Sequence, residues 1–278
     1  MGEFIHFFQK QMEVPGLFSL FHIICILIIV LVTIIISCKF KNCSYKTYKI
    51  IMAISFLICL VMEILKQLVL SYNYGNPSYF HYDFYNFPFH LCSTIYYIVP
   101  ILLLINKDKN KLIYESLTGF MCFFVLFGGI IVVLFNSLVM SERMYTNIQS
   151  MAHHGIQVVL GVFMFVWNRK EISIKTFFKS LIVLSIFTVL AIIINVSLFN
   201  ISDGIDMFYV NPYEVSVIPV INTIHEKAGF IPYLIVYLFV VIVLGFLTYF
   251  VSMLFANHFR IKKVFETKQI VSVIKHEN

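Results

Sequence analysis

A histidine and a cysteine lie two residues apart where an aromatic loop meets an apolar stretch. Residues 87–92 read Phe-Pro-Phe-His-Leu-Cys, so His90 and Cys92 enter that stretch together. A cysteine near the start of a helix is a candidate nucleophile, because the helix dipole and a neighbouring imidazole both favour the thiolate. Free N–H groups in the first helical turn would also stabilise an oxyanion. The alternative is an inert, buried thiol that only packs.

The base for this thiol is expected on another segment if the helix is regular. With Pro88 in the first turn, His90 and Cys92 point to nearly opposite faces, because residues two apart do not face each other. Either the first turn is distorted or the base comes from His153 or His154. These two differ by about 100° around a helix, so at most one points straight into a central cavity.

Other polar residues interrupt the apolar stretches. Cys59, Glu63, Lys66 and Gln67 have the spacing of a single helix face. For chemistry we select Cys92, His153, His154, His90 and Glu63. For substrate binding we select His22, Lys66, Gln67, Gln157 and Asn195. Simpler roles compete: Glu63 and Lys66 could only neutralise each other, and His22 and Asn195 could only join helices by hydrogen bonds.

Seven apolar stretches must position these residues. The chain of 278 residues is 60% hydrophobic and 12% charged, whereas soluble domains are about 25% charged. Stretches long enough to cross a bilayer core of roughly 30 Å cover residues 16–37, 50–71, 88–105, 112–139, 151–167, 180–199 and 230–256. We therefore predict an all-α, multi-pass protein of the cell membrane, a bundle of seven transmembrane helices.

The basic residues orient this bundle. Sixteen of the twenty Lys and Arg residues follow the first, third, fifth and seventh stretches, which places the N-terminus outside and the C-terminus inside. Most polar residues within the stretches then lie in the outer half. We predict an interfacial segment over residues 1–15, a transmembrane domain over 16–256 and a basic cytoplasmic tail over 257–278 that contacts anionic lipid. Since topology accounts for the net charge of +6, no nucleic-acid partner is expected.

Two motifs carry a family resemblance. Pro-Phe-His-Leu-Cys at 88–92 and His-His-Gly at 153–155 resemble the bacterial YwaF-type integral membrane proteins, seven-span proteins that also have a histidine and an acidic residue where this chain has His22 and Glu63. That family is similar to a eukaryotic transmembrane group that includes a cysteine-dependent acyltransferase making polyunsaturated ether phospholipids. The resemblance thus implies acyl transfer through a thioester. After the sixth stretch the pattern departs, which leaves the role of residues 201–229 open.

Three functions fit these residues. The first is a lipid-acyl enzyme, acyltransferase or hydrolase, with a phospholipid or other lipid substrate, a site open to the outer leaflet and no cofactor or metal. The second is a zinc-dependent lipid hydrolase that uses several histidines with Glu63 and Asp206, although an HExxH spacing is absent. The third is a solute carrier or lipid-binding protein lined by Glu63, Lys66 and the histidines.

Overall fold

The chain folds into a helical bundle. The computed structural model describes residues 2–75, 77–202 and 204–276, including all their side chains except those of Leu138 and residues 257–276. One short antiparallel hairpin pairs β1 (Tyr72–Asn73) with β2 (Tyr79–Phe80). The helices are α1 (Gly2–Phe8), α2 (Leu20–Phe40), α3 (Tyr45–Ser71), α4 (Ile95–Leu104), α5 (Lys111–Phe120), α6 (Leu126–Leu134), α7 (Met144–Asn168), α8 (Ile174–Leu198), α9 (Asn222–Ala228) and α10 (Phe230–His276).

Within the described residues, six helical stretches are long and apolar enough to cross a membrane, which makes this a multi-pass membrane protein. They are Leu20–Phe40, Tyr45–Ser71, Lys111–Leu134, Met144–Asn168, Ile174–Leu198 and Phe230–Ala256. The third predicted stretch, 88–105, instead forms the shorter apolar helix Leu91–Leu104, about 20 Å long at 1.5 Å per residue. Pro88 and the two residues after it remain outside the helix. The expected count of seven crossings therefore stays a prediction.

The helices extend beyond their predicted apolar limits because lysines occupy their ends. Helix α3 begins after Ser44, whose side chain accepts a hydrogen bond from the N–H of Thr47, so Lys49 lies inside the helix. Its ammonium group donates to the carbonyl of Leu103 at 2.8 Å, at the C-terminal end of α4. A lysine can thus end an apolar stretch in the sequence without ending the helix, since its long stem reaches a polar partner.

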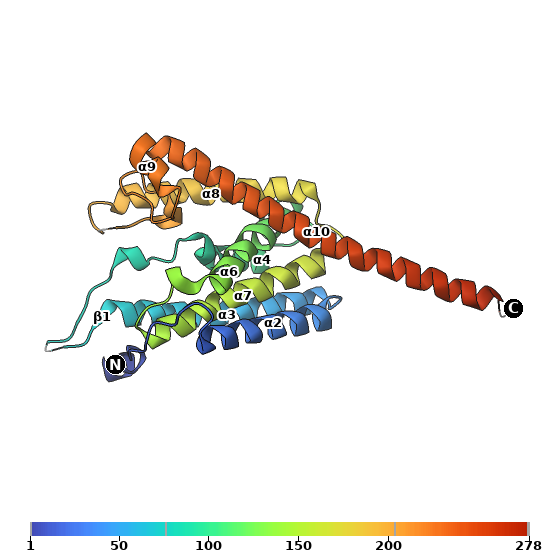
Figure 1. Cartoon of the computed structure of the whole chain (residues 1–278), viewed down its shortest axis with the longest axis horizontal. Coiled ribbons are helices and arrows are strands. Elements are labelled where there is room, and N and C mark those ends of the chain that lie inside the picture. Colours follow the sequence, from blue (N-terminus) through green and yellow to red (C-terminus); the bar gives the residue numbers. More distant parts are fainter. Residues whose placement is uncertain (1, 76, 203, 277–278) are drawn as a thin grey trace.

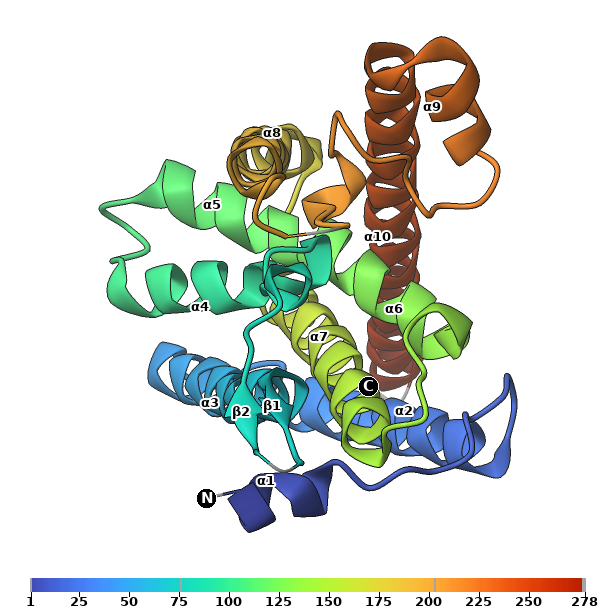
Figure 2. The same ribbon diagram turned by 90° about the vertical axis from the view of Figure 1, so that its left-hand side faces the viewer.

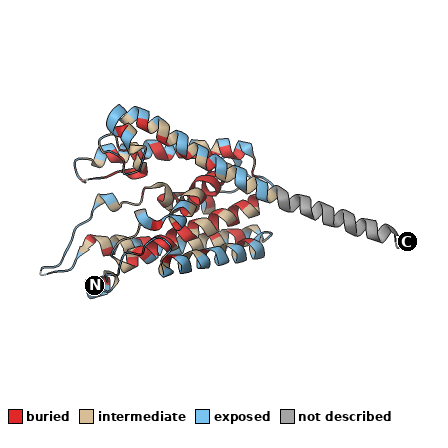
Figure 3. Cartoon of the chain, viewed as in Figure 1, coloured by how far each residue is buried: buried red, intermediate tan, exposed pale blue. Residues whose placement is uncertain are grey.

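Helix α7 lies at the centre of the bundle. It contacts α2 and α3 on one side and α6 on another, while α8 and α10 lie farther out (Figures 1 and 2). Burial follows this arrangement. In the 18-residue apolar stretch of each helix, the buried share is 61% for α7 and 67% for Lys111–Leu134, but 11% for α2 and 17% for Phe230–Ala256 of α10. The outer helices α2 and α10 expose many apolar residues, those of α10 within Phe230–Ala256 (Figure 3), as a lipid-facing surface requires.

A short N-terminal helix precedes the bundle, within the predicted interfacial segment. Ile5 of α1 packs in a cluster with Val69 and Tyr145, and the Gln9 amide donates to the carbonyls of Val69 and Tyr72 at 2.9 and 2.5 Å. This helix therefore contacts the end of α3. At the other terminus α10 continues to His276, and the predicted lipid contact of the basic tail lies outside the described side chains.

Candidate functional site

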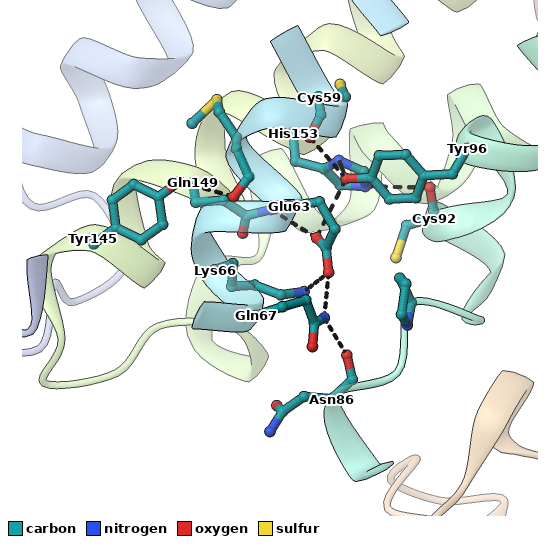
Figure 4. Close-up of polar contacts among 12 residues, drawn as sticks. Cys59, Glu63, Lys66, Gln67, Asn86, Cys92, Tyr96, Tyr145, Gln149 and His153 are labelled. Carbon is teal, nitrogen blue, oxygen red and sulfur yellow. Dashed lines mark hydrogen bonds and ion pairs between the residues drawn. The ribbon is translucent and has the colours of Figure 1, made fainter. Parts of the chain in front are cut away.

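A buried carboxylate, Glu63 of α3, is the centre of a polar cluster (Figure 4). Its Oε1 atom accepts hydrogen bonds from Lys66 Nζ at 2.7 Å and Gln67 Nε2 at 2.6 Å. Its Oε2 atom accepts from Tyr96 Oη at 3.3 Å and Gln149 Nε2 at 3.2 Å. Four donors from three helices thus surround one carboxylate, so Glu63 does more than neutralise Lys66.

The cluster continues from Glu63 through Tyr96 to His153. The Tyr96 hydroxyl lies 3.0 Å from His153 Nδ1, and the two rings stack with centroids 5.4 Å apart. On the far side of the imidazole, Nε2 lies 2.7 Å from Gln157 Nε2 and 3.3 Å from the carbonyl oxygen of Cys92. Helices α3, α4 and α7 therefore supply the successive members of a chain that ends at Cys92.

Hydrogen-bond chemistry gives this chain a direction. Gln157 Nε2 lies 2.7 Å from the carbonyl of Cys92, and a carbonyl only accepts, so the amide nitrogen of Gln157 must face it. The second N–H of that amide is then available to His153 Nε2, which makes Nε2 an acceptor and leaves the ring proton on Nδ1. Nδ1–H donates to Tyr96, whose hydroxyl donates to Glu63. We assign the tautomer from this network.

Cys92 lies in a distorted first helical turn, one of the two arrangements that the sequence left open. Residues Leu91–Thr94 form a 3₁₀ helix, η2, which leads into α4. The Ser93 N–H donates to the His90 carbonyl at 2.8 Å, so the N–H groups of Leu91 and Cys92 precede the first intrahelical bond. Pro88 lies before this turn and outside the helix. The regular helix with Pro88 in its first turn is therefore not the one observed. The Cys92 carbonyl faces His153 and its sulfur is turned away (Figure 4).

Of the predicted histidines, only His153 joins the cluster through hydrogen bonds. His154 Nδ1 lies 2.7 Å from the Ser150 carbonyl of its own helix, in agreement with the expectation that one of the pair points elsewhere. His90 Nδ1 is buried without a hydrogen-bond partner among the described residues. Among the described residues, no hydrogen bond joins the Cys92 thiol to an imidazole.

Two predicted substrate-binding residues hold the fold elsewhere. His22 is fully buried, with Nδ1 accepting from the Phe18 N–H at 3.0 Å and Nε2 2.8 Å from the Val133 carbonyl. Asn195 donates to the carbonyl of Met207 at 3.0 Å and accepts from its N–H at 2.7 Å. These contacts agree with the simpler role for both residues, in which His22 and Asn195 join parts of the fold by hydrogen bonds. Lys66, Gln67 and Gln157, by contrast, all belong to the cluster.

The segment after α8 approaches the site from another direction. Phe208 and Tyr209 both have a left-handed backbone, with φ of 57° and 58°, a conformation that costs energy for residues other than glycine. This turn places the Tyr209 ring 5.3 Å from the His90 ring, measured between centroids. Asp206, just before the turn, accepts a hydrogen bond from the Asn211 N–H at 2.9 Å, and burial raises its pKa to about 7.

Sequence analysis missed Tyr96, Gln149 and Tyr209. Tyr96 follows Cys92 by four residues and Gln149 precedes His153 by four, so helical periodicity could have found both. Tyr209 gives no such signal, because a loop of unknown shape carries it. For a metal, the described residues contain no group of three or more His, Cys, Asp or Glu side chains that could hold an ion, so the zinc-hydrolase alternative gains no ligand set.

Comparison with known proteins relates the chain to one family. A family model described as the TMEM164 family matches residues 17–257, which is most of the chain. The match includes every residue of the polar cluster and both sequence motifs, and the narrower YwaF-type resemblance stays a prediction. Neither the curated proteins nor the solved structures contain a match.

Proposed function

The chain belongs to the TMEM164 family, and from this membership together with the buried cluster we propose a lipid-acyl enzyme of the membrane. It transfers or hydrolyses an acyl group through a thioester on Cys92. The observation that carries the proposal is the directed chain from Glu63 through Tyr96 to His153, which ends against the backbone of Cys92. A carboxylate that orients an imidazole next to a cysteine residue is the arrangement that nucleophilic catalysis needs once the thiol turns toward the base.

The proposed reaction has two steps, acylation and deacylation of Cys92. First, the Cys92 thiol gives its proton to His153 Nε2, sulfur bonds to the acyl carbonyl carbon, and the ester C–O bond breaks. The leaving alkoxide takes the proton back and departs as a lysolipid. In the second step, the hydroxyl of an acceptor lipid, or water, gives its proton to His153 Nε2 while its oxygen bonds to the thioester carbonyl carbon. The C–S bond then breaks, and the proton passes from Nε2 to the sulfur, which restores the thiol. The first transfer requires the Cys92 sulfur, which is turned away from His153 (Figure 4), to rotate toward Nε2 about χ1.

Other members of the cluster bind the substrate. The N–H groups of Leu91 and Cys92, free at the start of η2, stabilise the oxyanion of each tetrahedral intermediate. Lys66 is one-fifth exposed although it pairs with Glu63, so its ammonium group can also contact a lipid phosphate, with Gln67 beside it. The Tyr209 ring next to His90 completes the lining. A phospholipid is therefore the substrate class we assign.

We also propose how this site lies in the membrane. Leu91–Leu104 is a short seventh crossing, the lysine-rich helix ends face the cytoplasm, and the cluster opens to the outer leaflet. The basic tail binds anionic lipid on the cytoplasmic side. Support comes from the charge distribution and from the shared location of Glu63, Cys92 and His153 toward one end of their helices.

The decisive experiment looks for the thioester. Purified protein in lipid nanodiscs is incubated with an alkyne-tagged phospholipid, and tryptic peptides are analysed before and after hydroxylamine. We expect a hydroxylamine-sensitive acyl adduct on Cys92 that moves onto added lysolipid, and its loss in Cys92→Ser.

Adventitious acylation is controlled by a second thiol. Cys25 of α2 is partly exposed, like Cys92, and lies on a lipid-facing helix away from Glu63, so it should stay unmodified. Equal adducts on both cysteines, or none on Cys92 in folded protein, would contradict the proposal and favour the carrier alternative.

A further inference from the structure

We propose that Tyr96 is a positioning residue that fixes the tautomer of His153, an inference that rests on the proposed function for its catalytic meaning. The Tyr96 phenol separates the Glu63 carboxylate from the imidazole, so no direct carboxylate–histidine contact orients the base. The two contacts on either side of the phenol, 3.3 Å to Glu63 and 3.0 Å to His153 Nδ1, define the connection.

The position of Tyr96 follows from the local backbone. Tyr96 is four residues after Cys92 and lies in the first turn of α4, so the turn that presents the thiol also sets the phenol one helical turn deeper. Its hydroxyl reaches the Cys59 carbonyl of α3 at 3.3 Å as well. The continuous helical segment of η2 and α4 therefore places both the nucleophile and the group that orients its base.

Tyr96 makes Nε2 the basic atom of the ring. Tyr96 accepts the hydrogen bond from Nδ1–H and donates its own O–H to Glu63. Nε2 therefore carries the lone pair, on the side of Cys92, where it accepts an N–H of Gln157. In the opposite tautomer, the Nε2–H group would point at the N–H of Gln157 2.7 Å away, two donors in contact. The Nδ1–H form avoids this contact between two donors, and Tyr96 is the group that accepts its hydrogen bond.

The phenol also lets the Glu63 carboxylate stabilise the imidazole during the reaction. When Nε2 takes the thiol proton, the ring becomes cationic, and a polarised O–H between ring and carboxylate stabilises that charge. Removing the hydroxyl leaves Nδ1–H without an acceptor in a buried site, which costs the desolvation of that group. Without that acceptor the Nδ1–H form loses its advantage, and the Nε2–H form, which can donate to the Cys92 carbonyl 3.3 Å away, directs a proton, instead of a lone pair, at Cys92.

A spectroscopic experiment reads the tautomer directly. Protein with ¹⁵N-labelled histidine is reconstituted in bilayers, and the ring ¹⁵N shifts of His153 are assigned by their loss in His153→Gln. The proposal expects Nδ1–H in the wild type and a change to Nε2–H in Tyr96→Phe. The matched control is Tyr97→Phe, since the neighbouring hydroxyl donates to the Pro88 carbonyl at 3.0 Å; this variant should keep the wild-type tautomer.

Acylation of Cys92 gives the second measurement. Tyr96→Phe should slow formation of the hydroxylamine-sensitive adduct by about 10- to 100-fold, the range for residues that orient a functional imidazole, and Tyr97→Phe should not. An Nε2–H wild-type ring overturns the proposal even if Tyr96→Phe does not fold, and so does an unchanged tautomer in folded Tyr96→Phe. If the wild type forms no adduct, the proposed function fails, while the tautomer still decides the role of Tyr96.

Discussion

At the residue scale, the molecule gathers polar side chains around one buried carboxylate, each of whose two oxygens accepts two hydrogen bonds. Glu63 is 5% exposed, and a lone carboxylate at such a position would be strongly disfavoured. Four donors compensate it, and three of them, Lys66, Tyr96 and Gln149, have different chemistry. These differences matter for function. Lys66 supplies a positive charge, Tyr96 connects the carboxylate to His153, and Gln149 holds the carboxylate against α7.

Asp206 provides a pH test at this scale. Burial raises its pKa from the ordinary 3.8 to about 7, with a further increase from Glu214, against the Asn211 N–H, which lowers it. Between these two values the folded chain binds more protons than the unfolded one, so the free energy of unfolding falls as pH rises from about 4 to 7 and then levels off. The full effect is at most about 4 kcal/mol.

Thermal unfolding of the protein in nanodiscs across pH 4.5 to 8 checks this. The melting temperature should decline with pH in the wild type, and Asp206→Asn should remove much of the decline. Glu226→Gln, an exposed carboxylate farther along the same segment, is the control and should leave the slope intact. A wild-type profile that rises through this window would refute the assignment of a largely protonated Asp206 at low pH.

At the element scale, close helix approach brings the cluster together. A Cβ on Gly155 would lie 2.7 Å from Ile29 of α2, so the glycine of the His-His-Gly motif permits α2 to pack against α7. On another face, a Cβ on Gly129 of α6 would lie 2.9 Å from the His154 carbonyl and 3.0 Å from the Gln157 Cβ. The helix that carries His153 is thus held between two glycine contacts.

Gly129→Ala should disturb this arrangement. The new methyl group meets backbone, which cannot rotate away, so α6 and α7 must separate by a few tenths of an ångström. We expect a loss of about 1–3 kcal/mol in stability and a roughly 10- to 100-fold slower acylation of Cys92, since small displacements at a reacting centre are costly.

The adjacent glycine supplies the control. A Cβ on Gly128 would come no closer than 3.8 Å, to Leu91, so Gly128→Ala changes helix propensity in the same way without the clash. Adduct formation and melting temperature, measured side by side, separate the two effects. Equal behaviour of the two variants would show that α6–α7 approach does not set the geometry of the site.

At the scale of the whole molecule, the number of crossings decides where the termini lie. Six crossings would place both termini on one side of the membrane, whereas a seventh through Leu91–Leu104 would place them on opposite sides. We predict opposite sides, with the C-terminus in the cytoplasm, because the lysine-rich ends follow alternate helices.

Epitope tags at each terminus of the full chain test this in bacterial cells. The N-terminal tag should bind antibody on intact spheroplasts, and the C-terminal tag only after permeabilisation. A C-terminal fluorescent-protein fusion should fluoresce and an alkaline phosphatase fusion should be inactive. Two tags with the same accessibility would mean an even number of crossings and would exclude Leu91–Leu104 as a complete span.

A second group of buried polar residues lies away from the Glu63 cluster. At the opposite end of α3 from Glu63, Tyr48 joins Tyr114 and Asn168 in a buried hydrogen-bonded group, with contacts of 3.1 and 3.2 Å. Tyr48 and Asn168 lie just outside the predicted apolar stretches 50–71 and 151–167. Each of these residues lies near a helix end and looks like an interfacial residue in the sequence. Only helix packing turns them inward, toward each other.

The sequence alone determined the membrane class, the apolar helices and several members of the cluster. Long apolar runs must be helical in lipid, where each backbone group needs a partner within its own segment, and polar residues such as Glu63 stand out in such runs because they are costly there. Periodicity also placed Glu63, Lys66 and Gln67 on one face, and the structure confirms that they meet.

Tertiary structure decided what local periodicity cannot express. Helix rotation and axial offset, set by contacts such as those at Gly129 and Gly155, brought Tyr96 between Glu63 and His153 and turned His154 back to its own helix. The fold also assigned His22 and Asn195 to structural contacts and directed Tyr209 to His90 through a strained turn. Such choices depend on which distant side chains pack together, and a single sequence carries no direct record of that packing.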